Sequence, residues 1–244
     1  MYGPERVEDV LEKVAAGMNY SEISRITGVS RRTVGTWARG NVPTARDKWK
    51  ALCVVCSDSF ERLAVGPYGY LLGLYLGDGS IAEYPRAFRL RIVCCNAYPA
   101  LVDECVMAMQ DVLPSRVCLV PCAGCTEVSS YSKHWACLFP QHGEGPKHKR
   151  PIVLEDWQQS VVDRFPAPFI RGLIHSDRCR VLNHVNGTAY PRYHFTNVSS
   201  DIRGLFASAC ERLGIEWRQN NHKNLSVAKR ATVRKLDEFI GPKS

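Results

Sequence analysis

The stretches GYLLGLYLGDGSI (residues 69–81) and PFIRGLIHSDRCR (residues 168–180) decide the fold of this chain. Aligning them places Gly73 on Gly172 and Asp78 on Asp177. Each stretch is largely apolar up to its aspartate, as expected of a buried helix that ends at the acid. Such self-similarity indicates an internal repeat in which each copy begins with a buried helix.

The sequence after each stretch repeats one order of elements. The first copy continues with strand-like FRLRIVC (88–94), helix-like PALVDECVMAMQDVL (99–113), and strand candidates at RVCLV (116–120) and HWACLF (134–139). The second continues with strand-like YHFTNVS (193–199), helix-like SDIRGLFASACERLG (200–214), strand candidates IEWRQ (215–219) and NLSVAKR (224–230), and a last helix ATVRKLDEFI (231–240). We therefore predict an α+β core of two pseudo-symmetric αββαββα repeats, residues 67–150 and 151–244.

Small residues mark the face on which the two repeated helices are expected to meet. They lie four positions apart in each helix and so share one face: Gly73 and Gly77 in the first copy, Gly172 and Ser176 in the second. Small side chains let two helix backbones approach closely, and such packing would bring Asp78 and Asp177 to the same end of the pair. A positive group is expected there, because a helix C-terminus disfavours negative charge.

Two carboxylates held together repel unless a proton or a cation lies between them. A hard divalent cation such as Mg²⁺ prefers oxygen ligands of this kind. Metal ions held by acidic residues beside a basic surface are suited to phosphodiester hydrolysis, because the metal activates water and stabilises the leaving oxygen. A structural alternative is that Asp78 and Gly79 simply form the turn that ends an apolar helix.

The nine-residue stretches LLGLYLGDG (71–79) and IRGLIHSDR (170–178) resemble the motif of the LAGLIDADG homing endonucleases. The resemblance covers residues 66–241 and is to the single-chain form with two motifs. It implies a saddle of strands on duplex DNA, a divalent-metal site at Asp78 and Asp177, and cleavage of both strands across the minor groove. It also implies that Lys229 is a catalytic basic residue near the scissile phosphate.

One departure from the family motif leaves two functions open. Arg178 stands where the family has glycine, and its guanidinium could neutralise Asp177. The family includes relatives that kept the saddle as DNA-binding regulators. The hypotheses are therefore a divalent-metal-dependent endonuclease and a non-catalytic transcription regulator. For either, the basic residues expected to lie on DNA are Arg86, Arg89, Arg91, Arg192, Arg218 and Lys223.

Residues 1–42 have the spacing of a helix-turn-helix. Val7, Val10 and Val14 predict a first helix. A second helix is expected to be capped by Ser21, with Ile23 and Ile26 facing inward, before a turn at Gly28. The start and exposed side of the third helix would present DNA-binding side chains: Ser30, Arg31, Arg32, Thr33 and Thr36. The alternative is a helical hairpin with solvated arginines. Residues 43–66 are predicted to be a linker.

Composition limits the class of protein. The chain has 244 residues, of which 45% are hydrophobic, and a net charge of +8. This apolar content argues against a disordered chain, and no apolar stretch is long enough to cross a membrane. The charged start MYGPERVEDVLEKV does not resemble a signal peptide, so we expect a cytoplasmic protein. Internal pseudo-symmetry predicts that it acts as a monomer on double-stranded DNA.

The 11 cysteines of a chain without an export signal are expected to be thiols or metal ligands. Cys53 and Cys56 have the spacing of half a zinc site, or are two partly buried thiols. Cys122 and Cys125 could complete a zinc tetrahedron with His134 and Cys137. In the alternative, Cys118 and Cys137 face a sheet core and Cys122–Cys125 is a turn around Gly124. The sequence favours the interpretations without zinc.

Two further groups have a structural and a functional interpretation. The stretch HGEGPKHKRP (142–151) connects the repeats, and its basic side chains either contact phosphates or are solvated. They are Lys147, His148, Lys149 and Arg150. His175, inside the second motif, is expected to be a partly buried structural histidine and not a base.

Overall fold

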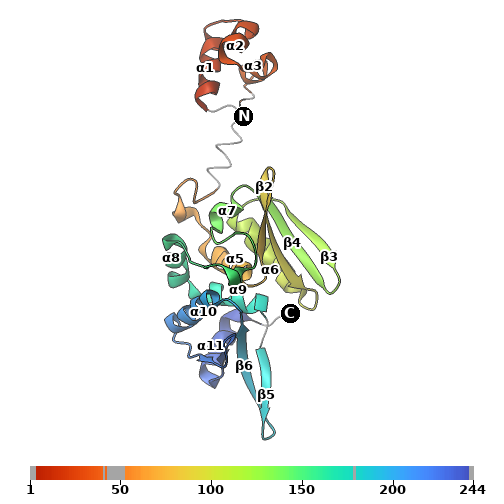
Figure 1. The fold of residues 1–244 in the computed structure, drawn as a ribbon, viewed down its shortest axis with the longest axis vertical. Coiled ribbons are helices and arrows are strands. Elements are labelled where there is room, and N and C mark those ends of the chain that lie inside the picture. Colours follow the sequence, from red (N-terminus) through yellow and green to blue (C-terminus); the bar gives the residue numbers. More distant parts are fainter. Residues whose placement is uncertain (1–3, 41, 43–52, 178–179, 242–244) are drawn as a thin grey trace. The chain divides into compact units, whose positions relative to one another are not determined.

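The computed structural model describes residues 4–40, 42, 53–177 and 180–241, which fall into two compact units, Met1–Leu52 and Cys53–Ser244. Figure 1 shows the helices of the first unit and the helices and sheets of the second. Among the described residues, the helices are too short or too polar to cross a bilayer.

The first unit consists of helices α1 (Pro4–Ala15), α2 (Tyr20–Thr27) and α3 (Arg31–Ala38). Gly28 ends α2 in the left-handed conformation, with φ of 67°, and the Ser30 side chain caps α3 by accepting from the backbone N–H of Thr33. Two expectations are wrong. Asn19, not Ser21, caps α2, because its side chain accepts from two backbone N–H groups there. Ile26 is 56% exposed; the core consists of Val7, Val10, Ile23, Val29, Val34 and Trp37.

The second unit contains the predicted repeat twice. The first copy has α5 (Val65–Gly77), β1 (Ser80–Tyr84), β2 (Ala87–Cys95), α6 (Pro99–Val112), β3 (Val117–Cys122), β4 (Cys125–Ser132) and α7 (Trp135–Leu138). The second has α9 (Pro166–Asp177), β5 (Arg180–Val185), β6 (Thr188–Thr196), α10 (Ser200–Arg212), β7 (Arg218–Gln219), β8 (Asn224–Val227) and α11 (Arg230–Ile240). The 3-10 turns η1 (Phe60–Arg62) and η2 (Lys147–Lys149) and helix α8 (Asp156–Arg164) lie before and between them.

Both sheets have the same antiparallel topology. Their strand orders are β1-β2-β4-β3 and β5-β6-β8-β7, so corresponding strands occupy corresponding places. Along β2, Leu90, Ile92 and Cys94 are buried while the residues between them face away from the core. Each sheet therefore buries one face against helices and turns the other face away from the core. The predicted α+β repeat is confirmed.

The structure corrects the last strand of the first repeat. HWACLF forms α7, and the strand is β4. Trp135 and Leu138 are both buried because helical spacing places them on one face. The strand was hard to predict because Glu127, Ser129 and Ser130 are polar yet buried, which hides the alternating pattern.

The structure also places part of the predicted 43–66 linker in the second unit. Residues 43–52 lie outside the described ranges. Cys53, Val54 and Leu63 are at most 7% exposed, and α5 begins at Val65. These apolar side chains join the large core, so the compact unit begins before the predicted boundary.

Helices α5 and α9 pack directly against each other at the middle of the second unit (Figure 1). A Cβ atom added at Gly73 would lie 2.7 Å from the backbone nitrogen of Leu173, and one added at Gly172 would lie 2.9 Å from that of Leu74. One added at Gly77 would overlap the side chain of Ser176. Glycine at these positions is therefore a requirement of the backbone approach, and both helices are buried along most of their length.

Gly172→Ala should destabilise the second unit by about 2 kcal/mol or more, because the added methyl group meets backbone atoms that cannot move aside. Gly204→Ala in α10 is the matched control, since a Cβ there meets nothing within 4 Å. Because alanine is the better helix former, the control should be neutral or stabilising by up to about 1 kcal/mol. Urea unfolding of both variants measures the difference, and equal midpoints would contradict the close helix contact.

Candidate nucleic-acid interface

Asp78 lies at the C-terminal end of α5, where its backbone N–H donates to the Leu74 carbonyl at 3.1 Å. Its side chain is exposed. The next residue, Gly79, is buried: a Cβ atom there would lie 2.9 Å from the Tyr75 carbonyl oxygen and 2.6 Å from Ile92. The turn after α5 packs so closely against Tyr75 and Ile92 that residue 79 cannot carry a side chain. This turn fixes Asp78 at the end of the helix pair.

Asp177 is the last residue of α9, and its side chain and Arg178 lie outside the described part of the structure. The preceding residue, Ser176, contacts Gly77, the residue that precedes Asp78. The contact between α5 and α9 therefore places residues 78 and 177 at the same end of the helix pair. The Ser176 hydroxyl donates to the Leu173 carbonyl at 2.9 Å, so its hydrogen bond lies within α9.

Lys147 supplies the positive charge expected at the end of α5. Its ammonium donates to the carbonyl oxygens of Tyr75, Leu76 (3.0 Å) and Gly77 (2.9 Å), and lies 4.9 Å from the centre of the Tyr75 ring. These carbonyls have no partner within the helix, and a lysine there also offsets the helix dipole. Lys147 lies in the basic connector, about 70 residues after α5, so no local pattern pairs it with the helix.

Asp78 borders two cavities. One, of about 410 Å³, lies between the end of α5, the connector residues Lys147 and His148, and the start of α10 around Asn197 and Val198. The other, of about 300 Å³, is lined by residues of α5, β2 and α9, including Cys94 and His175. The first cavity joins the two repeats, so a ligand in it would contact both halves of the unit.

His175 is a structural residue, as expected. Its side chain is 1% exposed, with Nδ1 3.0 Å from the Tyr70 hydroxyl and Nε2 3.2 Å from the Ile240 carbonyl. Burial and the nearby Glu104 raise the pKa of Tyr70, so its hydroxyl stays protonated. A carbonyl oxygen can only accept, so Nε2 is the donor to Ile240, and both ring nitrogens of His175 are engaged within the core.

The outward face of the first sheet carries two arginines that share one carboxylate. Arg89 and Arg91 alternate with buried residues of β2, and both pair with Glu127 of β4, Arg91 at 3.3 Å. Arg89 also lies over the ring of Tyr131, 5.7 Å from its centre. Arg86 is exposed in the β1–β2 turn. Glu127 was not predicted, and it offsets part of the positive charge of this face.

On the second sheet, three of the predicted basic residues share one cavity. Arg192, Arg218 and Lys229 line one cavity of about 360 Å³, in which Lys229 forms an ion pair with Glu216. Lys229 immediately precedes α11 and is exposed, and the two cavities at Asp78 are lined by other residues. Lys223 is exposed in the β7–β8 turn. The structure thus groups Lys229 with the sheet arginines.

In the first unit, four of the five predicted residues lie on α3, and Ser30 is the cap that precedes it. Arg31 and Arg32 are exposed. The other three make local hydrogen bonds: Ser30 caps the helix and its hydroxyl contacts that of Thr33 at 2.7 Å, while the Thr36 hydroxyl donates to the Arg32 carbonyl. The two arginines are therefore the side chains best able to reach a partner.

The arrangement of the second unit is shared with solved structures of LAGLIDADG homing endonucleases. The complex of I-DmoI with DNA and Mn has 15% sequence identity and a TM-score of 0.50, and the match covers 73% of this chain and 98% of that one. A variant of I-DmoI with its target DNA in the presence of Mg has 16% identity and a TM-score of 0.51, with 73% and 97% coverage. These matches establish the LAGLIDADG fold. No protein-family model matches the chain, and no curated protein matches its sequence.

Lys147→Met should lower the free energy of unfolding by about 2 kcal/mol, because it leaves carbonyls at the end of α5 without their charged donor. The control is Lys149→Met in the same turn, whose side chain is exposed. Thermal and urea denaturation of both variants test this. Equal stability of the two would mean that the lysine does not hold the helix end.

Proposed function

We propose that this chain binds a specific sequence of duplex DNA and cuts both strands beside Asp78 in a divalent-metal-dependent reaction. The observation that carries the proposal is the position of Asp78, exposed at the end of two closely packed helices and at the edge of a cavity that joins both repeats. The solved complexes of I-DmoI with DNA, Mn and Mg support the choice of partner and cofactor.

The donor chemistry at the helix ends fits a hard divalent cation. Lys147 binds the carbonyl oxygens of α5, so the donor that this helix offers to a metal is the exposed carboxylate of Asp78. Asp177 follows the Ser176–Gly77 contact and would be the second ligand. A bound Mg²⁺ would supply an activated water and stabilise the leaving oxygen. Lys147 adds a fixed positive charge beside a phosphate bound in this cavity.

The outer faces of the two sheets would hold the DNA backbone. Arg91 on the first sheet and Arg192 and Arg218 on the second offer charged donors to phosphates, with Arg86 and Lys223 in turns. The place of Lys229 in the Arg192–Arg218 cavity favours phosphate binding over a role at the metal. Because both halves belong to one chain, we expect a monomer to contact both sides of the site.

The first unit would add a second contact with DNA. Helix α3 begins with the exposed Arg31 and Arg32 and follows α2 through the Gly28 turn, the order of a helix-turn-helix with its recognition helix second. We expect these arginines to contact base edges or phosphates and to lengthen the recognised sequence.

A non-catalytic DNA-binding regulator is the second candidate. It is favoured by Lys147, because this ammonium already supplies a cation at the end of α5 beside Asp78. Arg178 could do the same for Asp177. In that case the chain would bind its DNA sequence equally well with and without Mg²⁺.

Asp78→Asn should reduce cleavage of a duplex that the parent cuts by about 100-fold or more, since losing a metal ligand removes several kcal/mol of transition-state stabilisation. Binding should change little, because the carboxylate does not attract phosphate. The control is Asp111→Asn on the exposed end of α6. Cleavage that is equally fast in both variants would rule out the metal site at Asp78.

Glu127→Gln should raise DNA affinity and steepen its salt dependence. Without the shared carboxylate, the positive charges of Arg89 and Arg91 are no longer offset and both side chains are released to bind phosphates. Each added phosphate contact changes the slope of log K against log salt by about 0.9. Glu238→Gln on α11 makes the same change in net charge on an exposed helix position. Binding titrations at several salt concentrations measure both, and identical slopes would contradict a DNA-binding role for this sheet face.

A further inference from the structure

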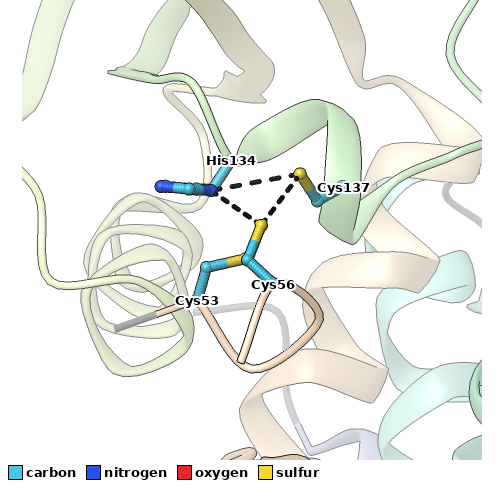
Figure 2. Close-up of side chains that lie close together, drawn as sticks. All are labelled: Cys53, Cys56, His134 and Cys137. Carbon is cyan, nitrogen blue, oxygen red and sulfur yellow. Dashed lines mark hydrogen bonds between the residues drawn. The ribbon is translucent and has the colours of Figure 1, made fainter. Parts of the chain in front are cut away.

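Four metal-ligating side chains meet at the start of the second unit. They are Cys53, Cys56, His134 and Cys137, whose ligand atoms all lie within 4.8 Å of one another. Figure 2 shows the thiols of Cys56 and Cys137 and the ring of His134 pointing toward one another. Among the described residues, this is the one group of at least three His, Cys, Asp or Glu side chains with such geometry.

Spacing alone offers Cys53 and Cys56 as half a zinc site, and His134 and Cys137 as partners of Cys122 and Cys125, with the interpretations without zinc favoured. Cys122 and Cys125 face each other across the two-residue turn at Gly124, as the alternative without zinc expected. Cys137 does not face a sheet core, because it lies in α7. Its neighbours are instead His134 and the Cys53–Cys56 pair, about 80 residues earlier in the chain.

We propose that Cys53, Cys56, His134 and Cys137 bind a structural zinc ion. A tetrahedral zinc site with Zn–S bonds of about 2.3 Å and a Zn–N bond of about 2.0 Å places its ligand atoms about 3.5–3.8 Å apart. The Cys56 sulfur lies 3.3 Å from His134 Nδ1 and 3.6 Å from the Cys137 sulfur, and Nδ1 lies 4.0 Å from the Cys137 sulfur. These three atoms therefore need to move by only a few tenths of an ångström, and the Cys53 sulfur lies within 4.8 Å of each of them.

Local structure prepares both halves of the site. Cys53 and Cys56 lie three residues apart in a helical turn, in which the Ser57 N–H donates to the Cys53 carbonyl at 3.0 Å. His134 and Cys137 have the same spacing at α7, where the Leu138 N–H donates to the His134 carbonyl at 3.0 Å. In each case helical spacing places both ligands on one face. Two such pairs, one Cys-x-x-Cys and one His-x-x-Cys, make a complete ligand set of three sulfurs and one nitrogen.

The ligand set favours zinc in a structural role. Thiolates and imidazole are soft ligands that suit zinc and not Mg²⁺, so this site is chemically separate from Asp78. Four protein ligands leave no open position for a substrate. The ion would fasten the first turn of the second unit, which begins at Cys53, to α7, whose Trp135 and Leu138 are buried in the large core.

The test is the metal content of the full-length chain purified from zinc-supplemented medium. We expect one zinc ion per chain by mass spectrometry. Replacement by Co²⁺ should give the visible absorption of a tetrahedral thiolate site. Cys56→Ser and His134→Ala should lose the metal, whereas the control Cys122→Ser, at an exposed cysteine outside the cluster, should keep it.

Stability provides a readout that needs no variant. A zinc-selective chelator should lower the melting temperature of the parent by several degrees, with recovery on adding Zn²⁺ but not Mg²⁺. A parent chain that contains no zinc and gives no Co²⁺ spectrum would overturn the proposal, as would a Cys56–Cys137 disulfide in its place. Equal loss of metal in Cys122→Ser and Cys56→Ser would also overturn it.

Discussion

The close approach of α5 and α9 is the constraint on which the rest of the second unit depends. At Gly73 and Gly172 each backbone touches the other, so these positions cannot carry a side chain. The residues around them, from Tyr68 to Leu76 in α5, are all buried. A helix buried on all sides has no polar face, which is why the first motif is apolar on every side until the acid. The second motif is less uniform, because its Arg171 pairs with Glu104 and its His175 contacts the Tyr70 hydroxyl. The two sheets and their outer helices then pack around this pair.

The chemistry of the site follows from the same contact. Because Gly77 meets Ser176, the chain leaves both helices at one end, and the acids come next in each. A helix C-terminus offers carbonyl oxygens and negative potential, which a cation stabilises. At α5 the ammonium group of Lys147 is this cation, and it binds the last carbonyl oxygens of the helix. The carboxylate of Asp78 is thus left at the edge of a cavity shared by the two repeats.

Much of this could be predicted from sequence, because the repeat and the glycine spacing are local patterns. The order of elements, the helix pair and the α3 cap at Ser30 are local in this sense. What could not be predicted depends on contacts between distant residues. Lys147 reaches a helix about 70 residues earlier, and the cysteine cluster joins two pairs about 80 residues apart. Strand β4 cannot be recognised from hydrophobic periodicity, because its buried residues include Ser129 and Ser130. These serines are held in the sheet by pairing with β2, which the sequence pattern does not show.

The proposed function requires the two repeats to act together on one DNA sequence. The most direct measurement is incubation of the parent chain with a randomised duplex library, followed by sequencing of the cut ends. The reaction is run once with Mg²⁺ and once without it, and no chelator is added in either case. We expect one defined sequence to be cut on both strands at a fixed position, and only with Mg²⁺. A library in which no sequence is cut in preference to the others would contradict it.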